Sequence, residues 1–231
     1  MRFGIVTFPG TTGAHDMAYA LAKLGHETEF VRHDATELPD VGGVVLPCGY
    51  SYGDYIRPGA LARSSAIIPA IAAAADGGMP VIGVGNGFQI LTEAGILPGA
   101  LVRNSGIDMV CATVPVLVEK SVCAWVDADE GTILELPIAH ESGHYVADEE
   151  TLAELREGGR IVLRYCEADG TRAEGGSALD GSTDDIAGIC NEAGNVFGLM
   201  PCIERAVDPV TGSSEGARLI QGITVSKEVA R

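Results

Sequence analysis

The segment at residues 81–90, with the sequence VIGVGNGFQI, has the pattern of a turn that presents a reactive side chain. An apolar run leads into a glycine-rich turn, and a helix is expected to follow. Many hydrolytic enzymes place a nucleophilic Ser or Cys at the centre of such a turn. Here the central residue is Gly85, which has no side chain that could attack a substrate. Either the turn serves another purpose, or it is the frame of an enzyme with a vacant nucleophile position.

The glycine pattern has two other interpretations. A dinucleotide-binding fingerprint needs a third glycine at position 88, where this chain has Phe88, and it belongs to the first strand–helix unit of a domain. A tight strand-to-helix turn needs glycine only for a positive φ or for close packing of the backbone. Taken alone, the pattern favours this second, structural interpretation.

The elements around the turn alternate between strand and helix patterns. Because such alternation places helices between buried strands, we expect a doubly wound, mostly parallel α/β sheet flanked by helices, with ligands at the carboxyl ends of its strands. The loops at 8–13 and 47–54 should join the Gly85 turn at that edge. The expected strands are 2–8, 27–31, 43–46 and 81–84, and the expected helices are 14–24 and 61–75.

The second half of the chain has strand patterns without helices, which predicts an antiparallel extension of the sheet. We expect an exposed acidic loop over 167–185 and one domain over 1–231, since no linker interrupts the chain. The expected strands are 109–118, 121–126, 133–138, 160–165, 186–190 and 196–199, followed by a helix at 215–223.

Composition excludes several function classes. The formal net charge of −17 opposes binding to nucleic acid. No apolar run reaches the ~20 residues needed to cross a bilayer, and the N-terminus lacks a basic region and a cleavage site. We therefore expect a cytoplasmic protein with neither a nucleic-acid nor a membrane partner. The six cysteines include no C-x-x-C pair, so we expect free thiols, with four of them packing on strands: Cys111, Cys123, Cys166 and Cys190.

Longer motifs extend the pattern over nearly the whole chain. They are FPG at 8–10, GVVLP at 43–47, YSYGDY at 50–55, NGFQIL at 86–91, RN at 103–104, PIAH at 137–140, RYC at 164–166, IAGICNE at 186–192, GNVFGLMP at 194–201 and ERA at 204–206. In these motifs the chain resembles the class I glutamine amidotransferases, and among them the glutaminase subunit of phosphoribosylformylglycinamidine synthase, an enzyme of purine biosynthesis.

The resemblance implies a catalytic Cys at the centre of the turn, a His after Met-Pro, and a Glu two residues beyond that His. At these positions this chain has Gly85, Cys202 and Glu204. The family's oxyanion loop reads Pro-Gly-Gly, whereas this chain has Cys48 as its second residue. The family mechanism needs a thiolate that attacks the glutamine amide and an imidazole that activates it. We therefore expect that this mechanism cannot operate here.

Two thiols thus replace one at the expected site. We predict a changed pocket formed by Cys48, Cys202 and Glu204, in which one thiol is a relocated nucleophile or both bind a soft metal such as zinc or copper. A disulfide is a third alternative, which a reducing compartment disfavours. No cofactor other than such a metal is expected. The resemblance also predicts a substrate-binding set of Gly49, Tyr52, Asn86, Gln89 and His140.

Two functions remain open at this point. In the first, the chain is a diverged homologue of the glutaminase subunit with a thiol pocket adapted to a small amide-like substrate. In the second, it is a non-catalytic or ammonia-using subunit that serves as a scaffold for a purine-pathway synthetase. Both alternatives allow a synthetase subunit of the purine pathway as a partner.

Overall fold

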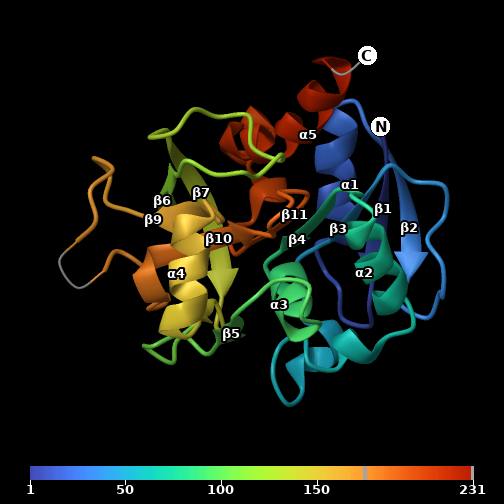
Figure 1. Cartoon of the computed structure of the whole chain (residues 1–231), viewed down its shortest axis with the longest axis horizontal. Helices are drawn as coiled ribbons and strands as arrows, with labels where there is room; N and C mark the ends of the chain where they lie inside the picture. Colours follow the sequence, from blue (N-terminus) through green and yellow to red (C-terminus); the bar gives the residue numbers. More distant parts are fainter. Residues whose placement is uncertain (174–175, 230–231) are drawn as a thin grey trace.

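The computed structural model describes residues 1–173 and 176–229. Within them, nine strands form one sheet in the order β2-β1-β3-β4-β11-β10-β9-β6-β7, and β5 pairs with β8 in a small second sheet (Figure 1). The strands are β1 Arg2–Thr7, β2 Glu27–Arg32, β3 Gly43–Leu46, β4 Val81–Val84, β5 Ala100–Val102, β6 Val110–Val118, β7 Ile133–His140, β8 His144–Val146, β9 Ile161–Tyr165, β10 Ile186–Cys190 and β11 Val196–Leu199.

The large sheet has a parallel part and an antiparallel part. Strands β2, β1, β3, β4 and β11 run parallel to one another. From β11 onward, β10, β9, β6 and β7 pair antiparallel. The predicted fold class, a mostly parallel sheet with helices and an antiparallel extension, is therefore confirmed.

Helices cover both faces of the sheet. On β4, Ile82 and Val84 pack in one apolar cluster with α1 and α5, whereas Val81 packs in a second cluster with α2, α3 and α4. This alternation follows from the two-residue period of a strand, which sends neighbouring side chains to opposite faces. The helices are α1 Ala14–Lys23, α2 Ile68–Asp76, α3 Asn86–Glu93, α4 Glu149–Glu157 and α5 Arg218–Val229.

Several expected elements differ from the structure. The helix predicted over 61–75 is split, because Ser65 adopts an extended backbone between the short 3-10 turn Ala62–Ser64 and α2. The strand predicted over 121–126 is absent, and Trp125 is instead buried there, with its indole N–H donating to the Asn195 carbonyl (2.9 Å). Helix α4 was not predicted, although Asp148 caps it by accepting a hydrogen bond from the Thr151 N–H.

The acidic loop over 167–185 is not uniformly exposed. In its second half Asp180, Ser182 and Asp185 are buried, and Arg172 and backbone N–H groups donate to the Asp185 carboxylate. Cys111 was expected to pack in the sheet but is exposed. The reason is that β6 alternates buried and accessible side chains, and Cys111 falls on the accessible side.

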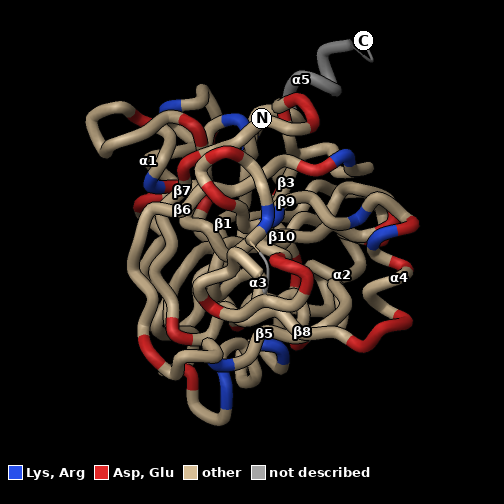
Figure 2. Tube along the Cα trace, turned by 90° about the vertical axis from the view of Figure 1, so that its left-hand side faces the viewer, with Lys and Arg blue, Asp and Glu red and all other residues tan. Residues whose placement is uncertain are grey.

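The excess of acidic residues lies at the surface. Figure 2 shows Asp and Glu positions spread over several loops and helices, in keeping with the net charge of −17. Among the residues that the structure describes, no helix is both long enough and apolar enough to cross a membrane.

The start of α3 lies very close to the end of β3. A Cβ atom added at Gly87 would be 1.9 Å from the Leu46 carbonyl oxygen, which is far inside contact distance. Only glycine allows this approach, which brings the turn after β4 against the loop after β3. The position of the functional loops thus depends on a residue that carries no functional group.

We expect Gly87→Ala to lower the free energy of unfolding by about 3 kcal/mol or more, the upper end of the cost of overpacking, because the clash is with backbone atoms. Urea unfolding measures this change. Gly106→Ala is the matched control, since a Cβ added there would meet nothing within 4 Å. If the two variants are equally stable, the close packing at Gly87 is not a constraint on the fold.

Candidate functional site

Gly85 forms the turn between β4 and α3. Its backbone has φ 54° and ψ −108°. Glycine adopts such a positive-φ conformation without the steric cost of a Cβ. The Gly85 N–H donates to the Leu199 carbonyl (2.8 Å), which ties the turn to the end of β11. The predicted sharp strand-to-helix turn is therefore present, at the carboxyl ends of neighbouring parallel strands.

Cys48 occupies the space in front of this turn. Its backbone is held in place because the N–H groups of Thr12 and Gly13 donate to the Cys48 carbonyl (3.3 and 2.9 Å). A Cβ atom added at Gly85 would lie 2.8 Å from the Cys48 Sγ. The thiol of Cys48 thus fills the place next to Gly85 where a side chain at position 85 would begin.

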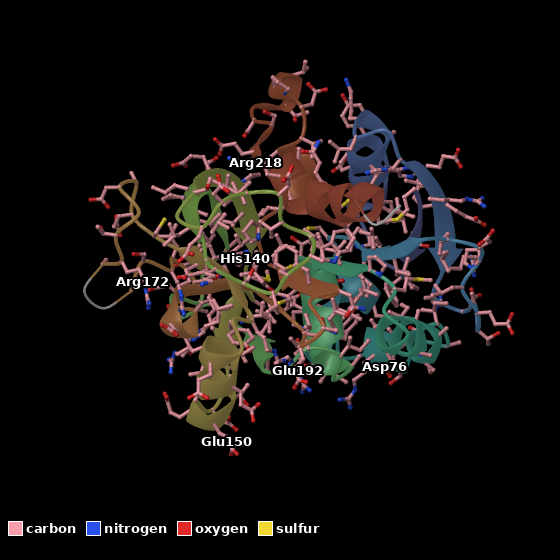
Figure 3. All side chains as sticks on the ribbon, turned by 45° about the horizontal axis from the view of Figure 1, so that its top comes forward. Asp76, His140, Glu150, Arg172, Glu192 and Arg218 are labelled. Carbon is pink, nitrogen blue, oxygen red and sulfur yellow. The ribbon has the colours of Figure 1, made fainter. Side chains whose placement is uncertain are left out.

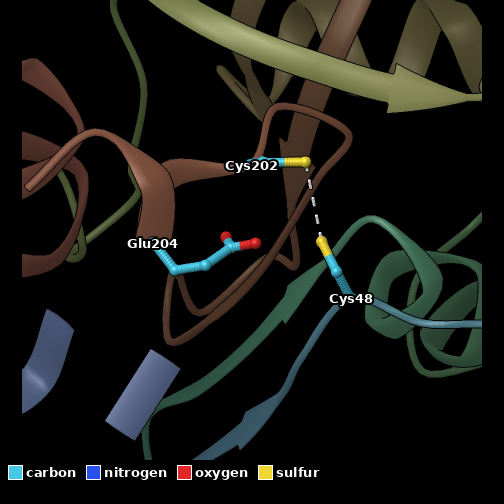
Figure 4. A group of neighbouring side chains, drawn as sticks. All are labelled: Cys48, Cys202 and Glu204. Carbon is cyan, nitrogen blue, oxygen red and sulfur yellow. Dashed lines mark hydrogen bonds between the residues drawn. The ribbon is translucent and has the colours of Figure 1, made fainter. Parts of the chain in front are cut away.

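Cys202 and Glu204 approach the same point from the segment that follows β11. The Cys48 thiol donates to the Cys202 Sγ over 3.8 Å, and Cys202 is 4% exposed. Glu204 is 3% exposed, and neither of its carboxylate oxygens has a hydrogen-bond partner. One ligand atom from each of the three side chains lies within 4.8 Å of the other two (Figure 4). The three residues expected to share a pocket do lie together.

Burial makes this cluster unfavourable for negative charge. It is the largest cause that raises the pKa of Glu204, from 4.5 to about 7. The hydrogen bond to Cys202, burial, and the charge of Glu204 together raise the pKa of Cys48 well above 9. Burial opposes the charge of the neighbouring Arg205, yet its pKa is raised because Cys202, Glu204 and Cys48 can carry negative charge. Around neutral pH, Cys48 is therefore a protonated thiol.

A chain of amide hydrogen bonds connects the loops around the cluster. The Ser51 N–H donates to Asn86 Oδ1 (3.1 Å), and Asn86 Nδ2 donates to Gln89 Oε1 (2.9 Å). Gln89 Nε2 in turn donates to the Ser142 carbonyl (2.6 Å). Asn86 and Gln89 are both buried, so these bonds form away from bulk water. They fix the loop after β3 and the loop after β7 against the start of α3.

These loops enclose a small cavity of about 90 Å³. Four residues of the predicted substrate-binding set line it: Gly49, Asn86, Gln89 and His140. Tyr52 does not, since its hydroxyl contacts His33 Nδ1 (2.9 Å) and Ser65 Oγ (3.0 Å) instead. Thr12, Asp54, Glu141 and Arg205 also line the cavity, although they were not among the predicted site residues.

His140 is buried beside the cavity and belongs to a second polar group. Its Nε2 lies 3.0 Å from Asp180 Oδ2, and its Nδ1 has no hydrogen-bond partner. Burial would raise the pKa of Asp180, but hydrogen bonds from His140 and Ser182 outweigh it and lower that pKa. Figure 3 labels His140 near the middle of the view and the exposed Glu150 at its edge. Asp180 therefore orients the imidazole within the protein.

Asp54 is a further carboxyl group of the cavity lining with an altered proton affinity. Burial and the nearby charge of Glu141 raise its pKa to about 6. Asp54 lies in the YSYGDY motif, but the burial that raises its pKa could not be inferred from the motif.

The first prediction from the site concerns the contact between Cys48 and position 85. Gly85→Ala should lower the free energy of unfolding by about 2 kcal/mol or more, since its φ is unfavourable for Ala and the Cys48 thiol must move. In a Cys48→Ala background the nearest remaining atoms are at 3.8 and 3.9 Å, an ordinary contact. The cost should then fall by about 0.5–1 kcal/mol in a double-mutant cycle. An unchanged cost would mean that the thiol does not fill this space.

The second prediction concerns pH. Because folding raises the pKa of Glu204 from 4.5 to about 7, the folded state favours the protonated acid. The contribution of Glu204 to the free energy of unfolding is complete below about pH 4.5 and is lost as pH rises through 7. At ~1.4 kcal/mol per pKa unit, the total loss is about 3 kcal/mol.

Urea unfolding in buffer without added metal ions measures this contribution. Glu204→Gln keeps the side chain neutral at every pH. The free energy of unfolding of this variant minus that of the unmodified protein should therefore be about 2–3 kcal/mol larger at pH 8 than at pH 5. Glu150→Gln, at an exposed position, is the control and should show no such trend. Equal differences at the two pH values for Glu204→Gln would contradict the burial of an ionisable group there.

Comparison with known proteins places this chain in a family. A family model described as a CobB/CobQ-like glutamine amidotransferase domain matches residues 1–226. The phosphoribosylformylglycinamidine synthase subunit PurQ of Thermomicrobium roseum is 46% identical over 233 residues, covering 100% of this chain and 98% of its own. The subunit of the same name from a Nostoc species is 44% identical over 225 residues, covering 96% of each chain.

Solved structures agree with these matches. A chain in the structure of PurLQS from Thermotoga maritima superposes with a TM-score of 0.86 at 38% identity, covering 98% of each chain. A glutamine amidotransferase from the same organism shares the fold, with a TM-score of 0.59 at 14% identity, covering 100% of this chain and 85% of its own. The resemblance found in the motifs is confirmed over the full length, and the chain belongs to the CobB/CobQ-like glutamine amidotransferase family, alongside relatives that are PurQ subunits of phosphoribosylformylglycinamidine synthase.

Proposed function

We propose that this chain serves as a subunit of a purine-pathway synthetase but does not hydrolyse glutamine by the mechanism of its family. The subunit role is supported by 44–46% identity to PurQ subunits over essentially complete chains, and by the superposition on a chain of the PurLQS structure. The partner would then be the synthetase subunit of the same assembly.

The observation that carries the catalytic part of the proposal is the environment of position 85. Gly85 offers no nucleophile, and the space beside it holds the Cys48 thiol, 2.8 Å from where a Cβ would lie. Covalent catalysis on an amide requires a side chain at this point that is activated by a neighbouring base. The loss of the nucleophile from such a triad lowers turnover by many orders of magnitude.

Neither cysteine is placed as a ready substitute for the missing pair. Cys48 lies closest to the vacant position, but its pKa is raised well above 9, and the thiolate is the nucleophilic form. Cys202 stands where the resemblance assigns a histidine, and a thiol does not act as an imidazole-like base at neutral pH. His140 lines the cavity, but its Nε2 is directed to Asp180. The position of Cys48 beside Gly85 thus supports the relocated-nucleophile hypothesis, whereas the raised pKa of its thiol opposes it.

What remains is a small cavity lined by amide, thiol and imidazole groups together with the ionisable side chains of Asp54, Glu141 and Arg205. Its volume of about 90 Å³ is well below the ~300 Å³ typical of sites for drug-sized ligands, so a bound substrate would be a small polar molecule. We therefore propose that, if the thiol pocket has a substrate, it is a small amide-like compound. Because Gly85 offers no nucleophile, the cavity is also compatible with the second function, a subunit that supports a synthetase supplied with free ammonia.

An assay with the synthetase partner from the same organism tests the proposal. With ammonium salts as nitrogen source the complex should form product, whereas with glutamine the rate should be at least about 10⁴-fold lower than for a relative that has cysteine at the turn. Glutamate release by the unmodified chain at a rate typical of such a relative, lost on mutation of the cavity, would refute the proposal.

Restoring the family residues provides the converse test. Gly85→Cys alone should not restore glutamine hydrolysis, since the new side chain meets the Cys48 thiol and lacks an imidazole partner. The triple variant Cys48→Gly, Gly85→Cys, Cys202→His removes both obstacles and should gain measurable hydrolysis. Recovery with Gly85→Cys alone would show that the cavity still contains a competent base.

A further inference from the structure

We propose that Cys48, Cys202 and Glu204 bind a thiophilic divalent cation, with zinc as the best fit. The proposal rests on the proposed function in one respect, namely that neither thiol is needed as a nucleophile. Its evidence is the arrangement of the three side chains at the cavity edge.

The distance between the two sulfurs matches a tetrahedral zinc site. Two thiolates bound to zinc at ~2.3 Å with a tetrahedral angle between them lie about 3.8 Å apart. The Sγ atoms of Cys48 and Cys202 are 3.8 Å apart. A cation could therefore bind both sulfurs with little movement of either side chain.

Glu204 supplies the observation that separates a metal site from a mere pair of thiols. A buried carboxyl group without hydrogen bonds is costly, and here both oxygens lack a partner. A disulfide between the cysteines would leave these oxygens unsatisfied, whereas a cation between the sulfurs and the carboxylate would satisfy them. One ligand atom from each residue already lies within 4.8 Å of the others.

The choice of ion follows from the ligand types. Two sulfurs and one oxygen suit zinc, which accepts Cys and Glu together, whereas copper(I) selects soft ligands only. Binding would release the two thiol protons, and also the Glu204 proton when that acid is protonated, to the solvent. The resulting charge of two thiolates and one carboxylate would be offset by the divalent ion and by the neighbouring Arg205.

The position of the ligands also predicts an open site. Cys48 and Cys202 both line the cavity beside Gly85, whereas Glu204 lines a different cavity together with Asp16, Tyr19 and Arg205. Figure 4 shows the Glu204 carboxyl group directed toward the space beside the two sulfurs. Three protein ligands with a fourth position toward a cavity is the arrangement typical of zinc sites that bind water or a substrate.

The test uses the reduced full-length protein with cobalt(II) and zinc(II) as probes. We expect one equivalent of cobalt to bind and to give thiolate-to-cobalt charge-transfer and tetrahedral d–d absorption, and zinc to displace it. Cys48→Ser, Cys202→Ser and Glu204→Gln should each weaken zinc binding by at least about tenfold, the smallest loss seen even for outer groups of metal sites. Cys166→Ser, away from the cluster, is the control and should bind normally.

A second measurement uses the unmodified protein, so that it does not depend on the folding of variants. Zinc should protect Cys48 and Cys202 from iodoacetamide more than the other four cysteines, as mapped by mass spectrometry. The absence of cobalt or zinc binding by the reduced protein, or binding that is unaffected by loss of either thiol, would overturn the proposal. So would a Cys48–Cys202 disulfide in a protein that binds neither ion when reduced. Because no assay here measures turnover, failure of the metal site is distinguishable from failure of the proposed function.

Discussion

The close approach of two backbone segments determines the geometry of this protein's cavity. Gly87 lies so near the Leu46 carbonyl that any side chain would collide with it, and the neighbouring Gly85 turn is thereby held against the loop that carries Cys48. The parallel pairing of β3, β4 and β11 brings the segment with Cys202 and Glu204 to the same edge. The chemistry of the cavity therefore depends on packing in which two glycines are required.

This constraint explains how a family frame can persist while its reactive groups change. The amide chain through Asn86 and Gln89 holds the loops together without using a side chain at position 85, so these loops do not depend on which residue stands there. The thiol of Cys48 lies next to Gly85, 2.8 Å from where a Cβ at position 85 would be. Burial raises the pKa of Glu204 to about 7, and the hydrogen bond to Cys202 together with burial raises the pKa of Cys48 well above its usual value.

The sequence predicted those parts of the fold that local patterns specify. Strands β3, β4, β10 and β11 were expected with the bounds observed, because they are short apolar runs that are buried on both faces. The helix predicted over 61–75 was too long, because the helix propensity of its alanines does not reveal the extended backbone at Ser65. Helix α4 was missed although Asp148 and the acidic first turn are recognisable start signals.

The site was predictable to the extent that motifs fix it. The grouping of Cys48, Cys202 and Glu204 followed from their positions in matching motifs, although they are far apart in the chain. The partnership of His140 with Asp180 could not be foreseen, because it links a strand to a loop that looked solvent-exposed. Tyr52 was assigned to the substrate by its motif, but its hydroxyl contacts His33 and Ser65 and the residue does not line the cavity.

We propose that the cavity no longer presents a thiol for attack on glutamine. Incubation with an electrophilic glutamine analogue, such as a diazoketone or chloroketone, followed by intact-mass and peptide mass spectrometry, tests this claim most directly. A cavity with Gly85 at the turn and a protonated Cys48 should leave the protein unmodified at a concentration that fully labels a relative with cysteine at the turn. A single stoichiometric adduct on Cys48 or Cys202 would contradict the account, because it would show that a relocated thiolate still meets the substrate.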